Sequence, residues 1–183
     1  MLCAALLGAC ASVPTHDEIQ SSFDAGLKAY DAGDYKTAYS IWGDIEDYDL
    51  AALRNVALML RMGKGVDKDP KTALKKMERA ADLGLATAQA DLGEMLINGE
   101  AGPPDKAAAV PWLVLAAAAG HPIAAFELAK IYQEGTAVPQ DLARARLLYK
   151  AAADAGVPDA AKRLESLGPA PAGATPAAAA SKH

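Results

Sequence analysis

The chain has 183 residues, of which 52% are apolar and 22% are charged. It is therefore long enough for one folded domain and too apolar for a disordered acidic chain. Aromatic residues make up only 5% and alanine, the strongest helix former, is abundant, which argues against a β-sandwich or barrel. The net charge of −5 argues against nucleic acid as the main partner, because phosphate binding requires clustered Lys and Arg.

The amino-terminal segment resembles an export signal. Residues 1–9 are uncharged and mostly apolar, and they are too short for the ~20 residues of a membrane-spanning helix. Leu7-Gly8-Ala9-Cys10 resembles a bacterial lipobox, in which the Cys becomes the lipidated first residue. We therefore expect a signal peptide over 1–9 and a lipidated linker over 10–16, with Cys10 as the lipidation site. The alternatives are cleavage after Ala11, which would give a soluble periplasmic protein, and a plain apolar first turn.

Two details extend this expectation. No charged segment precedes the apolar stretch, so either the start codon is placed late or the sequence is truncated. No Asp follows Cys10, which by resemblance implies an outer-membrane lipoprotein facing the periplasm. If Cys10 is lipidated and Cys3 removed, the mature chain has no free thiol for a disulfide or a thiolate zinc site.

Helical periodicity runs from about Asp17 to Leu167, and an internal repeat of 36 residues lies between these limits. Several types of position keep this spacing: Gly84, Gly120 and Gly156; Ala88, Ala124 and Ala160; Leu92, Leu128 and Leu164; Gly63, Gly99 and Gly135; Asp69, Asp105 and Asp141; Ala73, Ala109 and Ala145. Agreement at so many positions in one register indicates a repeat architecture.

Each unit has the pattern of a helical hairpin. In the middle unit, apolar spacing predicts a first helix over 88–98 that ends at Gly99, and Asp105 is placed to cap the second helix. Gly120 would end that helix, and small residues at Gly93, Ala109 and Ala116 allow close packing. Pro111 falls inside the second helix, so we expect either a kink there or a later helix start than in the other units.

These residues resemble the Sel-one-like repeat (SLR) family, a branch of the tetratricopeptide superfamily. The resemblance is carried by Gly63-Lys64-Gly65-Val66 in unit one, Leu92-Gly93 in unit two and Val138-Pro139-Gln140-Asp141 in unit three. Residues 23–42 resemble an ordinary tetratricopeptide hairpin, and 160–167 supply a capping helix. The resemblance implies an all-α fold, a short α-solenoid of antiparallel helical hairpins over 17–168: one tetratricopeptide-like hairpin, three 36-residue SLR units and the cap. Residues 169–183, rich in Pro and Ala, are expected to be a disordered tail.

No catalytic, cofactor-binding or metal-binding motif stands out in the sequence. His16 and His183 lie in the linker and tail, and His121 follows a helix-ending Gly, where a loop residue is the simplest interpretation and a ligand or base the alternative. The acidic run 44–49 lacks the glycine and distal Glu of an EF-hand loop, which favours a solvated turn. The basic cluster Lys71, Lys75, Lys76 and Arg79 is expected to be a solvated helix face.

In solenoids of this superfamily the first helix of each hairpin lines the concave side. The resemblance implies partner-binding groove positions at Arg54, Leu58, Arg61, Met62, Ala90, Glu94, Ile97, Asn98, Phe126, Lys130, Gln133 and Glu134, with plain solvated positions as the alternative. The favoured function is a non-enzymatic protein- or peptide-binding scaffold of the cell envelope, without cofactor, metal or nucleic acid. The alternatives are a cell-wall or β-lactam amide hydrolase, as in cysteine-rich relatives whose paired Cys are missing here, and a structural envelope spacer.

Overall fold

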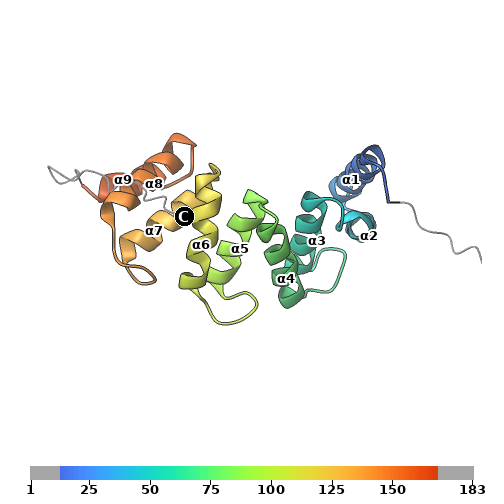
Figure 1. Cartoon of the computed structure of the whole chain (residues 1–183), viewed down its shortest axis with the longest axis horizontal. Coiled ribbons are helices and arrows are strands. Elements are labelled where there is room, and N and C mark those ends of the chain that lie inside the picture. The colour runs from blue at the N-terminus through green and yellow to red at the C-terminus, as the bar shows by residue number, and fades with distance from the viewer. Residues whose placement is uncertain (1–12, 169–183) are drawn as a thin grey trace, which may run out of the picture.

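The computed structural model describes residues 13–168, and this part of the chain contains only helices. Figure 1 shows them following one another along an elongated molecule, with α1 and α2 at one end and α8 and α9 at the other. The helices are α1 (His16–Asp31), α2 (Tyr35–Ile45), α3 (Leu50–Met62), α4 (Pro70–Asp82), α5 (Ala86–Asn98), α6 (Lys106–Ala118), α7 (Pro122–Glu134), α8 (Leu142–Asp154) and α9 (Ala160–Ser166). The predicted signal peptide, Cys10 and the predicted tail lie outside the described residues.

Consecutive helices pair as hairpins, and the hairpins stack in chain order. The main contacts join α1 to α2, α3 to α4, α5 to α6, and α7 to α8, while α9 packs on α8. The predicted all-α solenoid of one leading hairpin, three repeat units and a capping helix is confirmed. α1 begins at His16, one residue inside the predicted linker, because Thr15 and Glu18 form a reciprocal capping box there.

The repeated residues set the helix ends. Asp69, Asp105 and Asp141 each accept a hydrogen bond from the backbone N–H three residues later, at 3.0, 2.9 and 2.9 Å. Gly63, Gly99 and Gly135 end the first helices in the left-handed conformation, with φ of 71°, 66° and 68°. The predicted roles of Gly99 and Asp105 are therefore confirmed, and α3 to α8 all have 13 residues.

Small side chains allow the two helices of each hairpin to pack close together. Ala73, Ala109 and Ala145 are fully buried. A Cβ added to Gly93 would lie 2.5 Å from Cδ2 of Leu113, so only glycine fits between α5 and α6 without rearrangement. The alanine content is thus explained in part by the contacts between helices.

The expectation of a late helix start at Pro111 is wrong. α6 begins at Lys106, in the same register as α4 and α8, and runs to Ala118 with Pro111 inside it. The Asp105 cap fixes the start, and both Pro111 and Ala107, whose carbonyl loses its helical donor, are exposed to water. The kink remains a prediction.

The two charged runs interact with each other rather than remaining separate solvated surfaces. Lys76 Nζ lies 2.5 Å from Glu46 Oε1, and Arg79 Nη1 lies 2.7 Å from Asp47 Oδ1. Asp49 caps α3 by accepting from the Ala52 N–H at 2.7 Å. The acidic turn between α2 and α3 therefore helps to join the leading hairpin to unit one.

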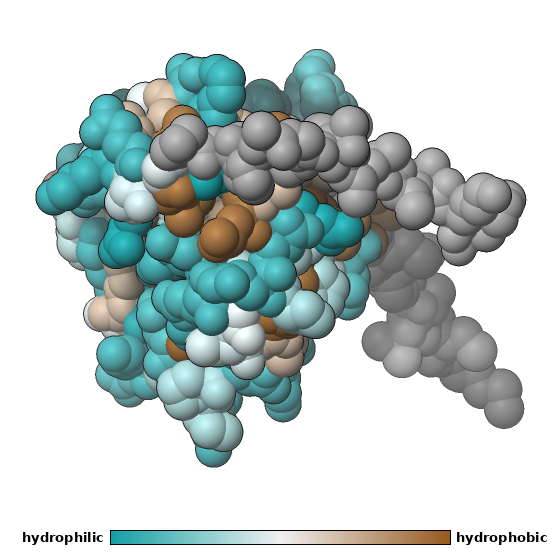
Figure 2. All heavy atoms as spheres, turned by 90° about the vertical axis from the view of Figure 1, so that its left-hand side faces the viewer, coloured by the Kyte–Doolittle hydropathy of each residue, from teal (hydrophilic) through white to brown (hydrophobic). Residues whose placement is uncertain are grey.

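The carboxyl-terminal end of the solenoid has the polar surface expected of a terminal repeat. α9 buries Ala160 and exposes Lys162, Arg163, Glu165 and Ser166. Figure 2, which faces this end, is mostly hydrophilic with small apolar areas. Among residues 13–168, no helix combines the length and the apolar character needed to cross a bilayer.

Candidate protein-binding surface on the first helices

The first helices of the three units, α3, α5 and α7, form what we call the first-helix row. The twelve predicted groove residues lie on it, four on each helix. Because the units share one register, residues 36 apart occupy equivalent positions: Arg54, Ala90 and Phe126 form one such set. The junctions between neighbouring helices of the row can therefore be compared position by position.

The first junction, between α3 and α5, is closed by two arginines of α3. Arg54 Nε donates to Asp91 Oδ2 at 2.6 Å. Arg61 donates from Nε and Nη2 to the two oxygens of Glu100, and its Nη2 lies 3.1 Å from Glu94. The Arg61 side chain is only 16% exposed, and its hydrogen bonds lower the pKa of the Glu100 carboxyl, while those same bonds raise the pKa of Arg61. These ion pairs connect units one and two.

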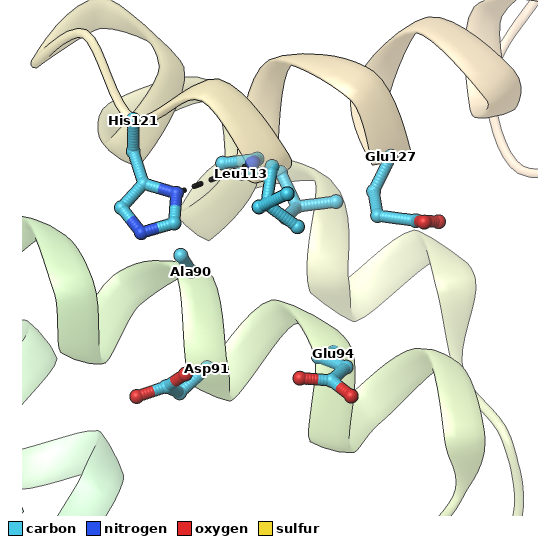
Figure 3. A pocket seen from close by; sticks show the side chains of 8 residues that line it. Ala90, Asp91, Glu94, Leu113, His121 and Glu127 are labelled. Carbon is cyan, nitrogen blue, oxygen red and sulfur yellow. Dashed lines mark hydrogen bonds between the residues drawn. The ribbon is translucent and has the colours of Figure 1, made fainter. Parts of the chain in front are cut away.

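The second junction, between α5 and α7, contains a hollow of about 180 Å³ instead. Figure 3 shows Ala90, Asp91 and Glu94 of α5 along one side, His121 and Glu127 along the other, and Leu113 of α6 between them. Ile123 and Ala124 complete the lining. The hollow therefore combines an apolar interior with three carboxyl groups and one imidazole.

His121 caps α7 rather than acting as a plain loop residue. Its Nδ1 accepts a hydrogen bond from the Ala124 N–H at 3.3 Å, which places the proton of the neutral ring on Nε2. Leu85, the equivalent residue of the preceding unit, makes no side-chain cap. Over the described range 13–168, no group of three or more His, Cys, Asp and Glu residues is arranged to hold a metal ion.

A family model for the Sel1 repeat matches residues 50–85, 86–121 and 122–157. The chain belongs to the Sel1 repeat family. The three matches coincide with the hairpins α3–α4, α5–α6 and α7–α8, so the 36-residue units found in the sequence are Sel1 repeats. No curated relative matches the sequence. Sel1 repeats generally mediate protein–protein interactions.

Solved structures support the same assignment. A Sel1 repeat protein from Oxalobacter formigenes is 30% identical, with 78% of this chain and 58% of that chain covered and a TM-score of 0.73. A protective antigen of uropathogenic Escherichia coli that displays an SLR fold is 23% identical over 81% of this chain and 33% of that chain, with a TM-score of 0.75. Helicobacter pylori cysteine rich protein B is 17% identical over 69% and 96%, with a TM-score of 0.56. The chain therefore spans a little over half of the Oxalobacter protein and a third of the Escherichia coli protein. The similarities to the Escherichia coli and Helicobacter pylori proteins concern the fold alone.

Several predicted groove residues of the third Sel1 unit also serve packing. The Phe126 ring is half-buried and lies edge-on to Tyr149, with 5.6 Å between ring centroids. Gln133 accepts a hydrogen bond from the Tyr149 hydroxyl at 2.7 Å. Lys130 pairs with Glu127 at 2.8 Å, and Glu134 pairs with Lys106 at 2.6 Å. These contacts leave only part of each side chain free for a partner.

The other predicted residues differ in how accessible they are. Met62 is 47% exposed at the end of α3, whereas Leu58 and Ile97 are half-buried. Asn98 is exposed and lies 3.4 Å from Glu100. Of the twelve residues, only Ala90 and Glu94 line the hollow.

Sequence reasoning missed Asp91, Ile123 and Glu127 in the hollow. Asp91 and Glu127 are 36 residues apart, each directly after a predicted groove residue, so aligning the Sel1 units would have shown a carboxylate at this position in units two and three. His121 was noticed, but its position as a cap beside Asp91 and Glu127 depends on how α5 and α7 pack.

Proposed function

We propose that this Sel1 repeat chain is a scaffold that binds a protein or peptide along its first-helix row, and that a lipid on Cys10 holds it at the bacterial outer membrane, facing the periplasm. The observation that carries the binding proposal is the hollow between α5 and α7, with its accessible Ile123 (49% exposed) beside three carboxyl groups. Concave sites that combine apolar side chains with a few polar groups are typical of binding sites.

The contrast between positions that repeat in all three units and positions that vary among them supports this proposal. Buried alanines, capping aspartates and helix-ending glycines recur in every unit. Other positions on the first-helix row change in size and charge from unit to unit, for example from the half-buried Arg54 to the buried Ala90 to the half-buried Phe126. Packing requires the repetition, whereas a specific partner requires a surface that is different at each unit.

The binding proposal is tested by photo-crosslinking in intact cells. A photoreactive amino acid at Ile123, or at the 47%-exposed Met62, should give a discrete adduct with one envelope protein. The matched control is Leu147 on the second helix α8, which is 55% exposed and should give no such adduct. Equal adducts from all three positions, or none from Ile123 and Met62, would contradict the proposal.

Anchoring is a separate part of the proposal and rests on the lipobox-like Leu7-Gly8-Ala9-Cys10. Cys10→Ser removes the thiol that would receive the lipid, so the protein should move from the membrane fraction to the soluble periplasmic fraction. Unchanged fractionation would rule out the anchor without affecting the binding surface. The proposed scaffold has no hydrolytic role, so purified protein should not turn over nitrocefin.

A further inference from the structure

We propose that the hollow between α5 and α7 receives an arginine side chain of the bound partner. This inference rests on the proposed scaffold function and specifies the chemistry of the partner segment. It comes from comparing the two junctions of the first-helix row.

The first junction shows how this repeat binds a guanidinium group. There Arg54 of α3 reaches across to Asp91 of α5, with 2.6 Å between Nε and Oδ2 and exposed fractions of 27% and 18% for the two side chains. Moving 36 residues along the chain replaces Arg54 by Ala90 and Asp91 by Glu127. The second junction thus keeps the carboxylate but has only a methyl group in place of the arginine.

The second arginine of the first junction is missing as well. Arg61 becomes Ile97 one unit later, and its partner Glu94 becomes Lys130. As a result, none of the ion pairs found within residues 13–168 joins α5 to α7. The three carboxylates of the hollow pair with Arg54, Arg61 and Lys130, but none of these pairs crosses from α5 to α7.

The lining of the hollow suits an arginine side chain in both shape and charge. Ala90, Leu113 and Ala124 offer methyl groups to the aliphatic stem, while Asp91 and Glu127 offer oxygens to the guanidinium. Glu94 also lines the hollow, but both of its oxygens face Arg61. Within the described part of the chain, Asp91 Oδ1 and Glu127 Oε1 accept no hydrogen bond, and each can accept one from an incoming group.

Two competing occupants fit less well. The hollow of about 180 Å³ is smaller than the ~300–1,000 Å³ of sites that hold drug-sized ligands or cofactors, and its side chains are not arranged to hold a metal ion. The existing partner of Glu127 is Lys130, which lies on the same helix and is 34% exposed. Such a partly exposed pair within one helix contributes little and can give way to a guanidinium from outside.

The test is an NMR titration of the isotope-labelled full chain with Nα-acetyl-arginine amide. The control probe is Nα-acetyl-citrulline amide, which has nearly the same shape but no charge. We expect the arginine amide to shift the backbone amides of Asp91, His121 and Glu127, and the citrulline amide to bind at least about tenfold more weakly, as for the loss of a charged hydrogen bond. Equal affinities would overturn the proposal.

Variants of the hollow make the test specific. Ala90→Arg places on α5 the arginine that α3 already carries, so it should fill the hollow and abolish binding. Glu127→Gln keeps the shape without the charge and should weaken binding about tenfold, which keeps the test valid even if Ala90→Arg fails to fold. Ala118→Arg adds the same charge at an exposed position of α6 and should bind as the wild type does. Unchanged affinity in Glu127→Gln, or equal loss in Ala118→Arg, would overturn the proposal.

Failure of this inference is distinguishable from failure of the scaffold function. If crosslinking from Ile123 captures a partner but Ala90→Arg leaves the adduct unchanged, the scaffold stands and the arginine site is wrong. If the arginine amide binds the hollow but no partner is captured, the scaffold function is wrong.

Discussion

The two junctions of the first-helix row have the same backbone framework but differ in the side chains that lie between the helices. Between α3 and α5, Arg54 and Arg61 extend across the junction and are largely covered. Between α5 and α7, Ala90 and Ile97 occupy the equivalent positions, and a hollow lined by carboxyl groups remains. Aspartate caps, glycine helix ends and buried alanines are the same on both sides of the comparison, so two side chains account for most of the difference.

This contrast indicates how a short solenoid can divide its tasks. Charged pairs at one junction fix two units relative to each other, while the absence of equivalent pairs at the next junction leaves the hollow that we propose as a contact site for a partner. Repeat proteins gain stability from interfaces between neighbouring units. The open junction therefore lacks some of that stability, and the proposed binding surface would be what the chain gains from it.

Of the substitutions that test the difference between the two junctions, Leu113→Ala should have the largest effect on stability, because it truncates a side chain that lines the hollow. Leu113 is 1% exposed and packs against Gly93. Its truncation should lower the free energy of unfolding by about 2–5 kcal/mol, the usual range for a buried Leu, measured by urea denaturation. Val114→Ala at the neighbouring, 40% exposed position should change it far less. Similar losses in both variants would mean that Leu113 is not a packing centre of this junction.

A second substitution removes the Arg61 ion pairs between α3 and α5. Arg61→Gln should lower the free energy of unfolding by about 1–3 kcal/mol, because it leaves the partly buried Glu100 without its cation and removes the weaker pair with the exposed Glu94. Lys130→Gln, which removes a surface pair within α7, is the matched control and should have an effect within about 1 kcal/mol. A loss in the control as large as in Arg61→Gln would remove the distinction between the junctions.

The closed junction should also contribute to the pH dependence of stability. Because Arg61 holds the pKa of Glu100 below its ordinary value of about 4.5, the folded state favours the ionised form. That stabilisation is complete above pH 4.5 and is lost as the pH falls through the lowered pKa of the folded state. Glu100→Gln should therefore lose less stability between pH 7 and pH 3.5 than the wild type, as followed by urea midpoints.

Glu134→Gln is the control for this pH series. Lys106 also lowers the pKa of Glu134, but that carboxyl is 40% exposed, so solvent screening reduces its contribution. Glu134→Gln should therefore reduce the loss of stability between pH 7 and pH 3.5 by less than Glu100→Gln does. The reverse order would show that the junction ion pair is not the stronger one.

The smallest expected effect is an increase in the free energy of unfolding. Ala90→Arg should raise the free energy of unfolding by about 0.2–1 kcal/mol, because it recreates on α5 the pair that Arg54 makes from α3. Combining it with Glu127→Gln should remove the gain, as a double-mutant cycle would show. A clear loss of stability in Ala90→Arg would mean that the hollow is too small for the side chain.

The sequence predicted local features well because the residues that set them are close together in the chain. Asp105 and Gly99 determine helix ends through bonds within a few residues, and the 36-residue spacing made the hairpins evident. For Pro111 the sequence left open a kink or a later helix start, and the structure excludes only the later start, because the Asp105 cap fixes where α6 begins.

The hollow could not be predicted in the same way. It depends on how closely α5 approaches α7 and on what Leu113 leaves unfilled, which are properties of packing. Phe126 likewise appeared to be a free contact residue, because its edge-on packing with Tyr149 of α8 has no signature in the repeat spacing. The absence of an arginine at Ala90, by contrast, can be read from the sequence by aligning the units, although the groove prediction did not draw on it.

The most direct test of the account is to identify what lies in the hollow when the partner is bound. A photo-crosslinker at Ile123, followed by mass spectrometry of the adduct, reports which residues of the partner lie beside it. The account predicts an adduct close to an arginine of the partner, which is lost in Ala90→Arg and retained in Ala118→Arg. An adduct with a segment that contains no arginine, formed equally well in Ala90→Arg, would contradict it.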